Sequence, residues 1–146
     1  EVVGLMCLKV FVNGNHDEYL RLKPFAMALG SAFQKVNFLR DLNADYNGLG
    51  RTYFPDLDLN TFDESNKKII EKEIEEDFKQ AHLGIVQLPK HARFGVYLAY
   101  VYYLSLFNKI KNTPSNKVIE SRIRIPNERK YAILVSSYVR HQIGLI

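Results

Sequence analysis

Apolar residues recur at spacings of three and four along most of the chain, which is the period of an amphipathic α-helix. The clearest example is the stretch 90–111. Its predicted buried face consists of Phe94, Tyr97, Leu98, Val101, Leu104 and Phe107. No segment shows a sustained alternation of apolar and polar residues bounded by turn residues, so no sheet is expected. The pattern therefore predicts an all-α fold.

Turn and capping residues divide the chain into predicted helices. Asp17 is predicted to cap a short helical entry, Pro24 to occupy the first turn of a long helix, and Asp63 and Asn127 to cap later ones. The predicted helices span 1–12, 24–46, 64–87, 90–111, 115–121 and 127–143. Residues 47–62, with two glycines and a proline, are predicted to form a long ordered loop. Because no segment reads as a linker, residues 1–146 are predicted to form a single domain.

The composition fits one globular domain, with 47% hydrophobic and 25% charged residues. The single cysteine, Cys7, excludes a disulfide scaffold, and we expect it to be a small buried residue. No apolar run is long enough to span a membrane.

The charge is distributed unevenly along the chain. Residues 1–80 carry a net charge of −4 and residues 81–146 a net charge of +8. A basic half is typical of nucleic-acid binding, but these basic residues are scattered and no recognition motif accompanies them. We therefore predict no nucleic-acid partner, and the alternative is that acidic residues hold a metal while basic residues meet an anionic substrate.

A narrow polar stripe runs along the predicted helix 24–46. Each residue of an α-helix is rotated by 100° about the helix axis from the one before it. On that basis the four members of the stripe lie within about 80° of one another around the helix. They are Gln34, Asn37, Asp41 and Asp45. The side predicted to lie opposite carries Phe25, Leu29, Ala32, Phe33 and Val36.

The two aspartates of this stripe are four residues apart, so their carboxylates are neighbours that repel each other. A bound cation would remove that repulsion, and Mg²⁺ prefers oxygen ligands of this kind. An ordinary exposed helix face has the same pattern, and that alternative stays open at this point. Arg40, Arg51 and Tyr53 follow closely, and an arginine after a glycine-rich turn can bind a diphosphate bidentately. Carboxylates for Mg²⁺ and an arginine for diphosphate are what ionisation of an allylic diphosphate needs.

Residues 34–45 and 50–55 resemble the second aspartate-rich motif of the squalene/phytoene synthase family. The family pattern is Q-x-x-N-x-x-R-D-x-x-x-D followed by G-R-x-Y-[LF]-P, and both parts are present here. Residues 1–6, 98–103 and 122–130 also resemble family segments. The resemblance covers essentially the whole chain, but only the second half of a family member.

This resemblance implies the second half of an isoprenoid-synthase fold, a helical bundle around a central cavity. It also implies head-to-head condensation of two prenyl diphosphates through a cyclopropylcarbinyl diphosphate, assisted by Mg²⁺ or Mn²⁺. We expect geranylgeranyl diphosphate as the substrate and phytoene as the product, while squalene and dehydrosqualene from farnesyl diphosphate stay open. An alternative is a non-catalytic helical module that binds a partner or a diphosphate-bearing lipid.

The resemblance also implies roles for individual residues. Asp41 and Asp45 would bind the metal with help from Asn37. Arg40 and Tyr103 would take part in catalysis. The residues that would contact the substrate are Gly4, Gln34, Asn37, Arg51 and Tyr53.

One part of the family pattern is missing, because no first aspartate-rich motif is present in this sequence. The acidic pairs at 71/75 and 73/77 alternate with lysines, so we expect them on a solvated helix face. We therefore expect the chain alone to be inactive or nearly so, and to expose apolar surface that would allow self-association. The hydrocarbon substrates imply a cytoplasmic protein with peripheral membrane contact.

Overall fold

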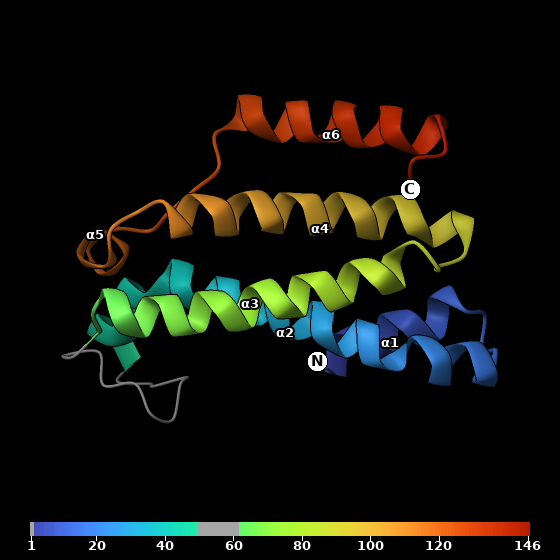
Figure 1. Cartoon of the computed structure of the whole chain (residues 1–146), viewed down its shortest axis with the longest axis horizontal. Coiled ribbons are helices and arrows are strands. Elements are labelled where there is room, and N and C mark those ends of the chain that lie inside the picture. Colours follow the sequence, from blue (N-terminus) through green and yellow to red (C-terminus); the bar gives the residue numbers. More distant parts are fainter. Residues whose placement is uncertain (1, 50–61) are drawn as a thin grey trace.

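The computed structural model describes residues 2–49 and 62–146, with side chains described for 2–42 and 62–146. Every regular element in these residues is a helix, so the predicted all-α fold is confirmed. The helices are α1 (Val2–Phe11), α2 (His16–Leu49), α3 (Glu64–Ile85), α4 (Lys90–Lys111), α5 (Ser115–Glu120) and α6 (Asn127–Gln142) (Figure 1). None of the helices within the described residues is both long and apolar enough to cross a membrane.

Helix α2 begins earlier than predicted and encloses Pro24, which was expected in the first turn. Asn15, and not Asp17, caps it: the Asn15 Oδ1 accepts hydrogen bonds from the backbone N–H groups of Asp17 (3.1 Å) and Glu18 (3.2 Å). Leu22 is buried in this first part of the helix. Capping and burial together stabilise the turns ahead of the proline, which by itself weakens a helix interior.

The two other predicted caps have different outcomes. Asp63 does cap α3, because its Oδ1 accepts a hydrogen bond of 2.8 Å from the backbone N–H of Asn66. The prediction for Asn127 is wrong, because it is the first helical residue of α6 and Pro126 precedes it without any side-chain cap. Proline has no side-chain acceptor, so no capping side chain accepts a hydrogen bond from the first backbone N–H groups of α6.

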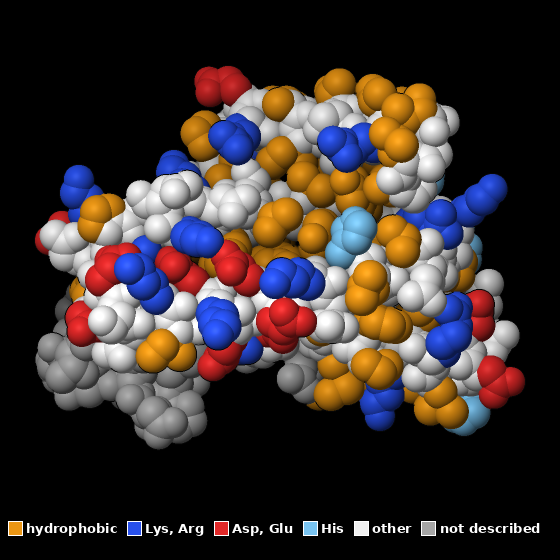
Figure 2. All heavy atoms as spheres, viewed as in Figure 1, with side chains coloured by type: hydrophobic (Ala, Val, Ile, Leu, Met, Phe, Trp, Pro, Cys, Tyr) orange, Lys and Arg blue, Asp and Glu red, His pale blue; other side chains and the backbone are white. Residues whose placement is uncertain are grey.

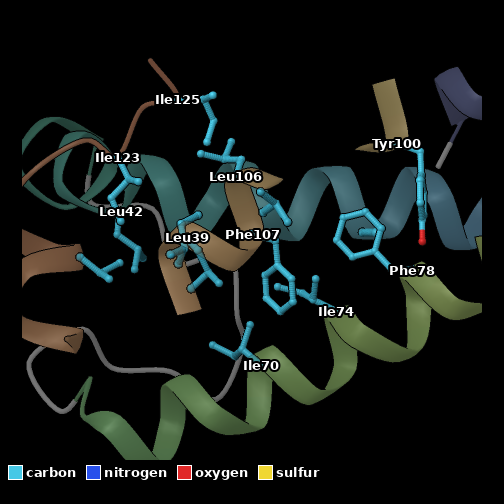
Figure 3. Close-up of a cluster of buried hydrophobic side chains, with 14 of the residues drawn as sticks. Leu39, Leu42, Ile70, Ile74, Phe78, Tyr100, Leu106, Phe107, Ile123 and Ile125 are labelled. Carbon is cyan, nitrogen blue, oxygen red and sulfur yellow. The ribbon is translucent and has the colours of Figure 1, made fainter. Parts of the chain in front are cut away.

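The long helix α2 is the centre of the structure. Helix α3 packs along it, α1 packs on its first half, and α4 lies against both α2 and α3 (Figure 1). Helix α6 lies alongside α4 on the side away from α3, as Figure 1 shows. The main core forms where α2, α3, α4 and the segment 118–125 meet (Figure 3).

A second, smaller apolar cluster closes the other end of the structure. It consists of Leu8, Val12, Leu22 and Leu88, with partly buried neighbours around them. Because Leu8 is the only buried residue of α1, most of that helix is accessible. Cys7 is accordingly exposed, and the prediction that it is buried is wrong.

The acidic residues of α3 are only partly on a solvated face, so that prediction is wrong for Glu71 and Asp77. Lys67 is 1% exposed, and its Nζ lies 2.9 Å from Glu71 and 3.0 Å from the carbonyl oxygen of Lys111. Asp77 accepts hydrogen bonds from Ser31 Oγ (2.7 Å) and Lys35 Nζ (3.0 Å). The reason is that α3 packs against both α2 and α4, so its flanks are covered.

Candidate functional site

A cavity of about 740 Å³ lies between α1, α2, α4 and the end of α3. Most of its wall is apolar or small. From α1 and α2 come Val3, Gly4, Cys7, Leu8, Phe11, Leu22, Phe25, Ala26, Leu29, Gly30, Phe33, Gln34 and Asn37. From α3, α4 and the turn between them come Ala81, Gly84, Ile85, Leu88, His91, Ala92, Gly95, Val96, Ala99 and Tyr103. A wall of this kind suits a long hydrocarbon chain.

One end of the cavity is polar, and three side chains form it. The Tyr103 hydroxyl donates a hydrogen bond of 3.3 Å to the Asn37 Oδ1. The Phe33 ring stacks on the Tyr103 ring, with ring centres 4.0 Å apart. Gln34 lines the cavity beside them. These contacts hold the Tyr103 ring and hydroxyl in one orientation at this end.

Asp41 lies one helical turn beyond Asn37, about 6 Å further along the axis. Both of its carboxylate oxygens are engaged by arginines. Arg40 Nη2 lies 2.5 Å from Oδ2, and Arg122 Nε lies 2.9 Å from Oδ1. The hydrogen bond to Asp41 raises the pKa of Arg40, and this outweighs the lowering by burial. The arrangement places two guanidinium groups around one carboxylate, close to the polar end of the cavity.

Arg122 is absent from the predicted site residues. It precedes Ile123 and Ile125, which are both buried in the main core, whereas Arg122 and Arg124 point outward. This alternation is typical of an extended segment with one face buried. The Arg-Ile-Arg-Ile pattern of 122–125 is a sequence signal for an outward-facing arginine, but only the fold shows that Asp41 is its partner.

The structure brings together Gly4, Gln34, Asn37 and Tyr103, which all line the same cavity. Phe25, Leu29 and Phe33, predicted on the side opposite the polar stripe, also line this cavity, and Leu29 and Phe33 pack against the main core as well. The core face of α2 carries the fully buried Ala32, Val36 and Leu39.

Gly4 has a packing role as well as a place in the cavity wall. A Cβ at this position would lie 3.1 Å from the carbonyl oxygen of Ala26. Its missing side chain therefore allows α1 to approach the backbone of α2.

Three predicted site residues cannot be placed in the same way. The side chain of Asp45, and Arg51 and Tyr53 altogether, lie outside the described residues, as does most of the predicted loop 47–62. Their roles stay predictions.

The donors near the polar end are oxygen atoms: the Asp41 carboxylate and the Asn37 amide oxygen. Within the described side chains, no group of three or more His, Cys, Asp or Glu could hold a metal. A small oxygen set of this kind fits Mg²⁺, which is commonly held by one or two carboxylates together with substrate phosphates. Because Arg40 and Arg122 already contact both Asp41 oxygens, a metal that binds together with its substrate would have to replace one of these contacts.

Residues 1–129 match the squalene/phytoene synthase family. The chain belongs to the squalene/phytoene synthase family. The matched residues include α1 to α5, so the family match takes in the whole cavity wall and Arg122. Membership of this family confirms the resemblance seen in residues 34–45 and 50–55.

Two relatives in the family are 15-cis-phytoene synthases. The one from Synechocystis sp. is 30% identical over 133 residues, which covers 81% of this chain and 39% of the relative. The one from Synechococcus elongatus is 29% identical over 130 residues, covering 79% of this chain and 42% of the relative. The chain thus spans about two fifths of the length of these relatives. No solved structure matches the chain significantly.

Proposed function

We propose that this chain carries one prenyl-diphosphate site of an enzyme that condenses two prenyl diphosphates head-to-head. The observation that carries the proposal is the cavity, which is apolar along its length and polar at the end next to Asp41 and its two arginines. The family and the phytoene synthase relatives favour geranylgeranyl diphosphate as substrate, phytoene as product and a cyclopropylcarbinyl diphosphate between them.

In this proposal, Asp41 and Asp45 hold Mg²⁺ or Mn²⁺, with the amide oxygen of Asn37 as a further ligand. When bound, the metal neutralises negative charge on the diphosphate and so favours its departure. Arg40 and Arg122 supply fixed positive charge at the same place. A guanidinium group forms paired hydrogen bonds with diphosphate oxygens as well as with a carboxylate.

The carbon chemistry would take place beside Tyr103. Loss of diphosphate leaves an allylic cation, and the outer ring faces of the stacked Phe33 and Tyr103, which both line the cavity, can attract positive charge through their π-electrons. Gln34 offers an amide to the diphosphate or to a water molecule. The apolar wall beyond them suits the hydrocarbon chain of the substrate.

We propose further that residues 1–146 bind substrate without completing the condensation. They contain one aspartate-rich motif, whereas the family reaction ionises two diphosphates in succession. A cytoplasmic location and contact with a membrane surface belong to the same proposal, since substrate and product both carry long hydrocarbon chains.

The test is calorimetric titration of geranylgeranyl S-thiolodiphosphate, a substrate analogue that resists ionisation, into the chain with and without Mg²⁺. We expect Mg²⁺-dependent binding that weakens at least about tenfold in Asp41→Asn and in Asp45→Asn, because a charge-assisted ligand is lost. Asp17→Asn, at the exposed start of α2, is the matched control and should bind like the wild type.

Circular dichroism checks that each variant is helical. A folded wild-type chain that does not bind the analogue would contradict the proposal. Binding that needs no Mg²⁺ and survives both substitutions would instead favour a non-catalytic module for diphosphate-bearing lipids.

A further inference from the structure

Helix α6 lies at the edge of the structure, packed on α4, and its outer side is apolar (Figure 1). Only Ile133 and Ser137 of this helix are buried. Five large apolar side chains on it are exposed, and we call them the α6 ridge: Tyr131, Leu134, Val135, Tyr138 and Val139. Because the family match ends at residue 129, the α6 ridge lies outside the part of the chain that matches the family. Family membership therefore does not explain it.

Basic side chains flank the α6 ridge. Counted at 100° per residue from Ile133, which is buried towards α4, the ridge spans about 100° to 240° around the helix. Arg129, Lys130 and Arg140 are exposed and lie within about 60° of Ile133, so they stand between the ridge and α4. We call these three residues the basic flank. Glu128 is the only acidic residue of α6.

The outer side of α6 is thus apolar, with positive charge along both of its edges. In Figure 2, apolar side chains follow the length of α6, and Lys and Arg side chains lie beside them. A bilayer that contains anionic phospholipid matches both features. Its acyl region takes the apolar side chains of a surface helix to a depth of about 5–10 Å, and its phosphate groups attract Lys and Arg. The long basic side chains can reach the phosphate groups while the ridge lies deeper.

Other occupants match only one of the two features. A second copy of α6 matches the α6 ridge, but it offers a single acidic residue, Glu128, to the basic flank. A nucleic acid matches the basic flank, but it leaves the apolar ridge in water. Charge complementarity and apolar surface together therefore favour an anionic membrane.

We propose that α6 docks the chain on membranes that contain anionic phospholipid, with the α6 ridge in the acyl region and the basic flank at the headgroups. Because α6 packs on α4, and α4 forms one wall of the cavity, docking would place the cavity about one helix layer, roughly 10 Å, behind the membrane surface. This inference rests on the proposed function, of which contact with a membrane surface is a part, and it names the surface and the lipid.

The first test is sedimentation of the chain with lipid vesicles that contain no prenyl diphosphate. One set consists of phosphatidylcholine, and the other contains about 30% phosphatidylglycerol. We expect binding to the anionic vesicles to be at least about tenfold tighter, because several basic side chains lie near the phosphate groups. Raising the salt concentration from about 0.05 M to about 0.5 M should remove most of this difference, since salt screens the attraction.

Replacing Val135 and Val139 together with glutamate puts charge into the α6 ridge. This variant should bind the anionic vesicles at least about tenfold more weakly, because a charged group resists transfer into the acyl region. Replacing Ile69 and Leu83 together with glutamate is the matched control, since both are exposed apolar residues of α3. It should bind like the wild type.

Replacing the whole basic flank tests the charge separately, through three simultaneous substitutions: Arg129→Gln, Lys130→Gln and Arg140→Gln. The α6 ridge is unchanged in this variant, and the preference for anionic vesicles should disappear. The matched control removes the same number of positive charges from exposed positions on α3, through Lys68→Gln, Lys72→Gln and Lys79→Gln. It should keep the preference.

Insertion of the ridge can be measured by fluorescence, because the chain contains no tryptophan. Val135→Trp should show blue-shifted emission on anionic vesicles, and bromine-labelled acyl chains should quench it, since the indole then lies in the acyl region. Ile69→Trp is the control on α3 and should show neither change. Circular dichroism checks that every variant is helical.

Three results would overturn the inference. In the first, the folded chain binds neither kind of vesicle. In the second, the variant with glutamate at 135 and 139 binds anionic vesicles like the wild type, which would mean adsorption by charge alone. In the third, the Val135→Trp emission shifts with protein concentration in water and bromine-labelled lipid does not quench it, which would mean that a second copy covers the ridge.

These outcomes are separable from those of the proposed function. No residue of α6 lines the cavity, so the variant with glutamate at 135 and 139 should bind geranylgeranyl S-thiolodiphosphate like the wild type when no vesicles are present. A chain that binds the analogue and no vesicle contradicts only this inference. A chain that binds vesicles through α6 and no analogue contradicts only the proposed prenyl-diphosphate site.

Discussion

At the scale of single residues, the site depends on side chains that hold one another in place. Tyr103 is fixed by a hydrogen bond to Asn37 and by stacking on Phe33. Asp41 is fixed between Arg40 and Arg122. Tyr103, Asn37 and Asp41 thus each have a partner that sets their orientation, and such preorganisation lowers the cost of binding an ordered ligand.

Tyr103→Phe tests this arrangement. The substitution keeps the ring that stacks on Phe33 and removes only the hydroxyl that orients Asn37. We expect the Mg²⁺-dependent Kd for geranylgeranyl S-thiolodiphosphate to rise about three- to tenfold, the effect of one lost hydrogen bond. The melting temperature should stay close to that of the wild type, as measured by circular dichroism.

Tyr131→Phe is its control, because Tyr131 is 70% exposed on α6, away from the cavity. Wild-type affinity in Tyr103→Phe would show that the hydroxyl does not orient the site.

At the scale of elements, α2 serves three purposes around its circumference. One side carries Ala32, Val36 and Leu39 into the main core. A second side, with Leu29 and Phe33, forms part of the cavity wall. The polar stripe lies beside this cavity-lining side. Asn37, one helical turn after Phe33, therefore lies at the polar end of the cavity. Helical periodicity therefore places the hydrocarbon wall and the polar ligands side by side on one element.

Two cavity glycines allow a matched test of packing between elements. A Cβ on Gly84 would overlap the Cβ of Phe25 and lie 2.7 Å from its Cγ, whereas a Cβ on Gly95 meets nothing within 4 Å. We expect Gly84→Ala to lower the free energy of unfolding by about 1–3 kcal/mol through overpacking between α3 and α2. Gly95→Ala should raise it by up to about 1 kcal/mol through helix propensity.

Urea unfolding followed by circular dichroism measures both glycine variants. Equal changes in the free energy of unfolding of Gly84→Ala and Gly95→Ala would contradict the packing argument. Such a result would mean that only the higher helix propensity of alanine is measured.

At the scale of the whole molecule, two helices leave apolar faces uncovered. On α1, Val2, Val3, Met6 and Val10 are exposed. On α6, only Ile133 and Ser137 are buried, and Tyr131, Leu134, Val135, Tyr138 and Val139 are exposed. Figure 2 shows apolar side chains gathered along α6. A contiguous apolar face of this kind favours association in water.

We expect the chain to self-associate through α6, as the sequence predicted for its exposed apolar surface. Sedimentation velocity should show larger species as concentration rises. Replacing Val135 and Val139 together with glutamate should shift the distribution to monomer, because charged groups resist burial.

Ile69→Glu is the control for this experiment, since Ile69 is an exposed residue on α3 (61%). It should leave association unchanged. A chain that is monomeric at every concentration would contradict the prediction.

The sequence by itself determined the features that depend on neighbours along the chain. Helix α4 spans the predicted residues 90–111, and α3 begins at its predicted cap, because periodicity and capping act over three or four positions. The same locality placed Gln34, Asn37 and Asp41 on one stripe and supported the family resemblance. The helix start predicted at Pro24 is wrong, because two local effects compete there. Proline favours the first turn of a helix, but the cap at Asn15 and the burial of Leu22 begin α2 earlier, so Pro24 lies inside it.

Only the tertiary structure decided which distant residues meet. Asp41 and Arg122, Asn37 and Tyr103, and Ser31 and Asp77 are far apart in the sequence, and the packing of α2 against α3, α4 and the segment after α5 brings them together. The packing of the helices also decided which residues are buried. Lys67 is covered because α3 and α4 meet around it. Cys7 is exposed because α1 touches α2 along one narrow side. The physical reason is that burial and long-range pairing depend on what lies across a helix, whereas periodicity records only which side of the helix a residue occupies.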